Sequence, residues 1–145
     1  CINAATGISF TGLTVGWNTG VYTKQTEYFD VDDQKWFDSG YYTTLEMTNL
    51  TGSNGGVLSK SYVRWKGTGT LDLLSGVANV GVVLDSAMNT YQIADHSTLF
   101  IKRNPAANMR KKSRYGNKLN IEVSIPPYFA VDTYHGVITY TLFEN

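Results

Sequence analysis

The sequence has few of the residues on which disulfides, metal sites and nucleophilic catalysis depend. It contains one cysteine and two histidines among 145 residues, so no disulfide can form within the chain. The histidines, His96 and His135, lie far apart in the sequence, unlike a short-spaced zinc pair. The chain also lacks a G-x-S-x-G motif, a phosphate-binding glycine loop and an H-E-x-x-H motif. These absences predict a protein that is not an enzyme and holds no cofactor.

Strong net charge and long apolar runs are absent too. Only 17% of the residues are charged, and 12 Lys and Arg balance 12 Asp and Glu. A neutral chain gives no reason to expect nucleic acid or lipid as a partner. No apolar run approaches the roughly 20 residues that a helix needs to cross a bilayer. A chain of this length fits one domain, which can bury a core without disulfides.

Short strand signals separated by turn signals make up most of the sequence. Ten tyrosines and an aromatic content of 13% suit a sheet-rich extracellular protein. We expect a helical turn within residues 85–95, a loop at 104–117, and strands at residues 8–17, 21–31, 41–48, 57–65, 70–74, 79–84, 98–102, 118–125 and 134–143. This pattern predicts an all-β fold: a single antiparallel β-sandwich, Ig-like or pilin-like, with about eight or nine strands.

The end of the chain gives the clearest part of this pattern. Pro126 and Pro127 cannot donate to a ladder, so they stop the strand at residues 118–125. Residues 134–143 are mostly β-branched or aromatic, which favours a long closing strand. Within residues 118–125, one face carries Leu119, Ile121, Val123 and Ile125, which we expect to face the core.

The start of the chain is a candidate donor strand. We divide the chain into an N-terminal segment at residues 1–17 and a β-sandwich domain at 18–145. Apolar residues alternate in the segment, with a one-residue slip at Thr11 and Gly12 that suggests a bulge. Such a strand can complete a neighbour's open sheet through Ile8, Phe10, Leu13 and Val15. The alternative is an ordinary edge strand that pairs within its own chain.

The neutral net charge hides two segments of opposite sign. Seven of the 12 basic residues lie in 102–118, and five of the 12 acidic residues lie in 27–38. Complementary patches steer association between copies, and a contact between two different patches builds a filament if it does not close. The predicted contact residues are Lys111, Lys112, Arg114, Asp32 and Asp33. The alternatives are two solvated loops, or a basic loop that grips an anionic polymer such as teichoic acid.

The acidic segment is also a candidate calcium site. Carboxylates in one loop are the hard oxygen ligands that Ca²⁺ prefers. The spacing is not that of an EF-hand, and no glutamate closes the loop. The candidate ligands are Asp30, Asp32, Asp33 and Asp38.

Two single residues are candidate modification sites. A cysteine at position 1 is where a mature bacterial lipoprotein carries its lipid, so Cys1 is a candidate for lipidation and the only expected link to a membrane. The alternative is a plain free thiol. Asn49, followed by Leu50 and Thr51, forms a glycosylation sequon just before a turn.

Two segments carry motifs of a known family. Residues 31–45 read VDDQKWFDSGYYTTL, and residues 125–142 read IPPYFAVDTYHGVITYTL. They resemble the Asp-x-Arg-Gly…Gly-Trp and closing Ile-Pro-Ala…Trp-Thr-Leu segments of WxL-type surface domains of Gram-positive bacteria. The second is also similar to the end of many pilin-like β-sandwiches. Tyr140 stands at the family's tryptophan, and Gln34 and Lys35 at its Arg-Gly pair. The resemblance implies a β-sandwich in an extracellular bacterial setting and assigns no site.

Together these observations predict a structural protein at the cell surface. The preferred hypothesis is a pilus-like filament subunit that binds copies of itself by strand complementation. The alternative is a monomeric module, WxL-like, that binds cell wall or glycan. Aromatic side chains would then stack on sugars. The candidates are Trp17, Trp36, Trp65, Tyr41 and Tyr42.

Overall fold

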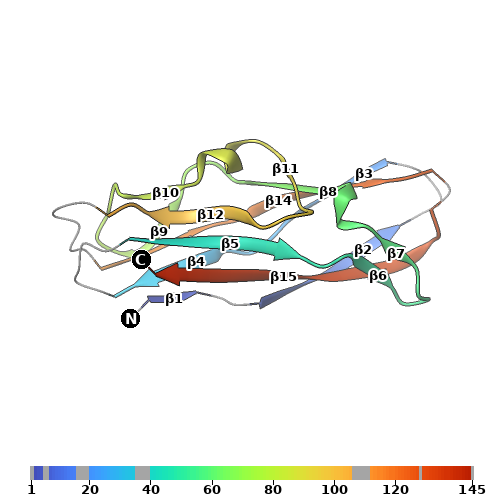
Figure 1. The fold of residues 1–145 in the computed structure, drawn as a ribbon, viewed down its shortest axis with the longest axis horizontal. Coiled ribbons are helices and arrows are strands. Elements are labelled where there is room, and N and C mark those ends of the chain that lie inside the picture. The colour runs from blue at the N-terminus through green and yellow to red at the C-terminus, as the bar shows by residue number, and fades with distance from the viewer. Residues whose placement is uncertain are drawn as a thin grey trace.

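The protein folds as an all-β sandwich of antiparallel sheets, which confirms the predicted fold class (Figure 1). The computed structural model describes residues 2–4, 7–15, 20–34, 40–105, 112–127 and 129–144. These residues form fifteen strands, of which β7 and β11 have two residues each, and two short 3-10 helices. The strand number exceeds the predicted eight or nine because two expected strands are each divided into two, and because the short strands at Ile2–Ala4, Leu50–Gly52, Gln92–Ile93 and Ser113–Asn117 were not predicted.

One layer of the sandwich is a seven-stranded sheet, here called the β5–β15 sheet. Figure 1 shows β12, β5 and β15 running side by side along the long axis of the molecule. β2 pairs with β15 beside this path. The path itself runs β10 (Val82–Leu84), β12 (Thr98–Arg103), β5 (Tyr41–Met47), β15 (Asp132–Glu144), β6 (Leu50–Gly52) and β7 (Val57–Leu58).

The predicted bulge near the start of the chain is confirmed in β2 (Gly7–Val15). Leu13 lies opposite Tyr134, whereas Phe10 lies opposite Gly136. Thr11 and Gly12 therefore face the single residue between those partners. Two residues against one is the arrangement that defines a β-bulge.

The other layer consists of two four-stranded sheets. The β4–β13 sheet has the order β1 (Ile2–Ala4), β4 (Phe29–Asp33), β13 (Ser113–Asn117) and β9 (Asp72–Gly76). The β8–β14 sheet has the order β11 (Gln92–Ile93), β8 (Val63–Gly67), β14 (Leu119–Ile125) and β3 (Gly20–Gln25). Three connections join the two sheets directly along the chain: β3 to β4, β8 to β9, and β13 to β14. The second layer is thus one sheet broken across its strands.

Side chains bridge this break. Asn117 is fully buried, and its Oδ1 accepts a hydrogen bond of 2.8 Å from the Thr68 backbone N–H. Its Nδ2 donates to the Thr70 carbonyl at 3.2 Å. Between β3 and β4, the Thr26 Oγ1 accepts from the Leu119 N–H at 3.0 Å. These side chains replace backbone partners that the broken ladder no longer supplies, as buried polar groups require.

The break explains the largest error in the strand prediction. The expected strand at residues 21–31 is divided at 26–28 into β3 and β4, which lie in different sheets. The expected strand at 57–65 is divided too, into β7, the 3-10 helix η1 (Lys60–Tyr62) and β8. Val63 and Trp65 are buried, but Val57 is 53% exposed because it precedes this interruption.

Two further segments differ from the prediction and two confirm it. Residues 113–117, expected within a loop, form β13, whereas the apolar 70–74 region leads into a largely exposed β9. The helical turn expected within 85–95 is confirmed as η2 (Ser86–Asn89). The strand at 118–125 is confirmed as β14, with all four predicted inward residues buried.

Aromatic side chains join the layers at the core. The Phe29 ring meets the Phe100 and Tyr140 rings edge-on, with centroids 5.9 and 5.2 Å apart. Trp65 is fully buried and donates its indole N–H to Thr98 Oγ1 at 3.3 Å. Both sheets of the broken layer therefore pack on the β5–β15 sheet. Each large apolar side chain buried in this way contributes about 1.5–3 kcal/mol.

Candidate functional site

The predicted interface strand lies at an edge of the β5–β15 sheet. β2 runs antiparallel to the first part of β15, from Val15 opposite Asp132 to Gly7 opposite Thr139. Among the described residues, β15 is its only ladder partner. In the single chain this strand pairs within its own molecule, as the alternative interpretation of the sequence expected. The strand carries the candidate interface residues Ile8, Phe10, Leu13 and Val15.

The acidic and basic segments meet inside one chain. β4 pairs with β13, which places Asp32 opposite Arg114. Arg114 forms an ion pair with Asp30. Arg103 donates from Nη1 to the Asp33 carboxylate at 2.5 Å, and each of these two side chains is 1% exposed. Opposite charges that were expected to attract between copies therefore attract within the fold.

The predicted role of Asp33 in a subunit contact is consequently wrong, because a buried carboxylate cannot reach a neighbouring copy. Asp32 is half-buried and accepts a hydrogen bond from the Gln34 side-chain amide at 2.5 Å. Lys112 is exposed, whereas Lys111 lies outside the described residues. Arg114 is half-exposed beside its partner Asp30.

The structure does not assemble the calcium candidates. Along β4, Asp33 points into the core toward Arg103, opposite to the side on which Asp30 and Asp32 lie. Asp38 lies outside the described residues. The part of the chain that the structure describes holds no group of three His, Cys, Asp or Glu side chains able to bind a metal.

The aromatic residues predicted to stack on sugars differ in their burial. Trp65 and Tyr41 lie in the core and cannot contact a surface ligand. Burial, followed by the nearby Asp33 charge, raises the pKa of the Tyr41 hydroxyl well above its usual value. Tyr42 is exposed and stacks on Phe143, with ring centroids 4.9 Å apart and 14° between the planes. Trp17 and Trp36 lie outside the described residues.

The modification candidates lie at the surface or beyond the described residues. Asn49 is exposed between β5 and β6, where its Oδ1 accepts from the Lys60 backbone N–H at 3.0 Å. Cys1 lies outside the described residues. Across the described ranges, none of the helices has the length and apolar character needed to span a bilayer.

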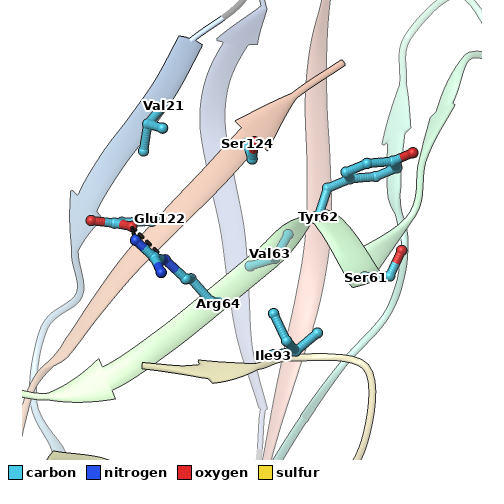
Figure 2. Close-up of a pocket in the computed structure, with 8 residues that line it drawn as sticks. All are labelled: Val21, Ser61, Tyr62, Val63, Arg64, Ile93, Glu122 and Ser124. Atoms are coloured by element: carbon cyan, nitrogen blue, oxygen red, sulfur yellow. Dashed lines mark hydrogen bonds and ion pairs between the residues drawn. The ribbon is translucent and has the colours of Figure 1, made fainter. Parts of the chain in front are cut away.

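Sequence reasoning missed a hollow on the outer face of the β8–β14 sheet. Figure 2 shows side chains from β3, η1, β8, β11 and β14 around it. The hollow has a volume of about 260 Å³. Its lining includes Val21, Tyr62, Arg64, Ile93, Glu122 and Ser124. Val21, Arg64, Glu122 and Ser124 occupy outward positions of their strands. The strand register that gathers residues from five elements cannot be read from one sequence.

An ion pair crosses the hollow. The Arg64 Nε donates a hydrogen bond of 2.6 Å to Glu122 Oε2, and the Arg64 Nη2 lies 2.5 Å from the same oxygen (Figure 2). The Arg64 guanidinium also lies over the Tyr91 ring, 4.4 Å from its centroid. Burial and then a hydrogen bond to Glu122 raise the pKa of the Tyr91 hydroxyl. These contacts hold Arg64 on two sides.

Comparison of the chain with protein-family models, curated proteins and solved structures found no match. The resemblance to WxL-type and pilin-like domains therefore stays a prediction.

Proposed function

We propose that the protein is a structural subunit of an extracellular filament, in which neighbouring copies exchange β2. The observation that carries this proposal is the position of β2 at a sheet edge, with β15 as its one described partner. The extracellular setting rests on the family resemblance of residues 31–45 and 125–142.

The β15 strand is suited to accept a strand from another copy. On one side it pairs with β5 along its second half and with β6 near its start. That framework holds β15 in place when β2 leaves. The uncovered edge would then present the backbone groups of Asp132 to Thr139 to an incoming strand. Main-chain hydrogen bonds of this kind give strand complementation its affinity.

Exchange between copies replaces each contact with an identical one. A β2 strand from a neighbour meets the same β15 residues in the same register, so the ladder loses no hydrogen bonds. The bulge at Thr11 and Gly12 fixes that register, because a slip would move every side chain to the other face. Exchange of identical elements is a low-cost route to association, and a contact that does not close gives a filament.

A paired-cysteine variant distinguishes the two arrangements. In a Cys1→Ser background, Ser9→Cys and Val137→Cys place thiols on residues that oppose each other across β2 and β15. Opposed residues of antiparallel strands lie within disulfide range. We expect oxidation after assembly to give a ladder of covalent multimers on a non-reducing gel, because the two cysteines belong to different copies. Oxidation before assembly should lock β2 in its own chain and prevent fibres.

The matched control joins β5 to β15, which are not exchanged. Thr44→Cys with Thr141→Cys, in the same background, also places thiols on opposed residues. This pair should give only a monomeric band. A monomeric band from the β2 pair in assembled material would overturn strand exchange.

Electron microscopy tests assembly itself. Negative staining of the natively produced protein should show long regular fibres, and a copy lacking residues 1–17 should show none. Single particles from both would overturn the filament function, whereas fibres from both would overturn the role of β2.

A further inference from the structure

The outer face of the β8–β14 sheet has a second hollow beside the first. It has a volume of about 280 Å³, and its lining includes Gln25, Tyr91 and Asn120. Gln25 lies opposite Asn120, and Val21 lies opposite Ser124, on the same two strands. The hollows therefore follow one another along β3 and β14. Together they offer an extended site rather than a single closed pocket.

The first hollow combines exposed apolar surface with hydrogen-bonding groups. Tyr62 is 46% exposed, and Val21 and Ile93, at 60% and 43%, come from strands on opposite sides of the sheet. Arg64 and Glu122 lie between them (Figure 2). Ligand sites share this composition of apolar walls with a few placed polar groups.

Few charged side chains lie on this face, and the first hollow is lined by one charge of each sign, Arg64 and Glu122, which form an ion pair. Lys66, over the Tyr91 ring at 4.7 Å from its centroid, and Lys24, at the second hollow, give the face only a small excess of positive charge. A phosphate-rich polymer would need an excess of cations, as nucleic-acid surfaces have. The face instead suits a neutral ligand that stacks on apolar groups and exchanges hydrogen bonds.

The polar groups are held in place before any ligand arrives. Arg64 is bonded to Glu122 and stacked on Tyr91, so its side chain has little freedom left to lose. The Gln25 side-chain amide donates to Asn120 Oδ1 at 3.1 Å in the second hollow. Binding to groups fixed in this way costs less conformational entropy.

We infer that the outer face of the β8–β14 sheet binds a neutral oligosaccharide that lies along both hollows. A sugar ring has an apolar C–H face, which meets Tyr62 and Ile93. Its hydroxyls both donate and accept, which matches the free donors of the Arg64 fork and the oxygens of Glu122 and Ser124. This site is separate from the edge where β2 pairs, so it does not depend on filament assembly.

The test measures binding of soluble neutral hexasaccharides by calorimetry, with cellohexaose, chitohexaose and maltohexaose as probes. We expect at least one to bind, and Tyr62→Ala or Arg64→Ala to weaken its affinity about tenfold, as loss of one stacking or charge-assisted contact does. Both side chains are exposed, so circular dichroism should show unchanged folding. Gln25→Ala should weaken the hexasaccharide more than the matching disaccharide, which fills the first hollow alone.

The matched control is Tyr42→Ala, which removes an exposed aromatic side chain from the opposite layer. It should leave the affinity unchanged. A loss with Tyr42→Ala and none with Tyr62→Ala would place the site on the β5–β15 sheet and overturn the inference. Failure of all three neutral hexasaccharides would overturn it too. So would binding of hexagalacturonate alone that disappears in 0.5 M salt, since charge would then be the attraction.

Discussion

The two sheets of the broken layer face the same partner but bury different chemistry. The β8–β14 sheet turns apolar or aromatic side chains inward, among them Val63, Trp65 and Ile121. The β4–β13 sheet buries polar groups beside its apolar ones, including Asp33, Ser113 and Asn117. The β8–β14 half of the layer is therefore stabilised by non-directional apolar burial. The β4–β13 half also depends on buried hydrogen bonds and an ion pair, each of which needs a particular partner. Variants in the β4–β13 half should consequently be less tolerated than comparable ones in the other half.

The largest difference should appear between two arginines. Arg103→Met removes the arginine that forms an ion pair with the buried Asp33 carboxylate. We expect the free energy of unfolding to fall by about 3–5 kcal/mol. Arg64→Met breaks the half-exposed pair with Glu122, which should cost at most about 1 kcal/mol. Urea unfolding of the two variants measures the contrast.

A double variant separates the buried charge from the packing. Asp33→Leu with Arg103→Met removes both charges and should be more stable than Arg103→Met alone, since the buried carboxylate is removed together with the arginine that pairs with it. Equal stability of these two variants would contradict our explanation of the large single effect.

A smaller effect is expected at the break between the sheets. Asn117→Ala leaves the Thr68 N–H and the Thr70 carbonyl without their side-chain partner. The free energy of unfolding should fall by about 2–3 kcal/mol. The control is Asn120→Ala on the outer face of β14, where the amide is only half-buried and the cost should stay within about 0.5 kcal/mol. Similar losses of unfolding free energy in both variants would mean that the Asn117 hydrogen bonds across the break do not stabilise the fold.

Two glycines offer a finer comparison. Gly76 and Gly69 both have positive φ, at +86° and +96°. A Cβ on Gly76 would lie 2.3 Å from the Lys112 carbonyl, whereas one on Gly69 would meet no atom within 4 Å. Alanine should cost about 1–2 kcal/mol at each through the backbone conformation, and more at Gly76, where the backbone at Lys112 must also move. Thermal unfolding compares them, and a more damaging Gly69→Ala would contradict the close approach of β9 to β13.

The smallest effect concerns pH and the unbroken β5–β15 sheet. The Asp132 carboxylate accepts from Ser53 Oγ at 2.6 Å and from the Asn54 N–H at 2.9 Å. These hydrogen bonds, the Ser53 bond first, lower the pKa of Asp132. A lowered folded-state pKa stabilises the protein above the unfolded value of about 3.9, and this contribution is lost as pH falls through the folded value. Urea midpoints between pH 7 and pH 2 should fall less for Asp132→Asn than for the natural protein.

The same contrast between the sheets explains what the sequence could predict. The alternation of Leu119, Ile121 and Val123 predicted β14 and its inward face correctly, because every inward position is apolar. β13 was expected to be a loop because its inward positions include Ser113 and Asn117, whose partners are distant in sequence. A strand whose inward residues are polar has the sequence pattern of a loop, unless the groups that pair with those residues are known.

The hollow of Figure 2 could not be predicted for a related reason. Arg64, Glu122 and Tyr91 are ordinary outward residues in their own segments. Only the pairing of β8 with β14 and β11 brings them together. The charged segments at 27–38 and 102–118 were recognised, but the sequence alone did not reveal that Asp33 and Arg103 meet inside one chain.

The position of β15 has a consequence for the timing of folding. β2, β5 and β6 all depend on this one strand, which is the last described segment of the chain. At a synthesis rate of roughly 5–20 residues per second, β2 waits on the order of ten seconds before its own partner exists. During that interval a finished β15 on another chain competes for it. Crowding of newly made copies would therefore favour exchange, and dilution would favour a closed monomer.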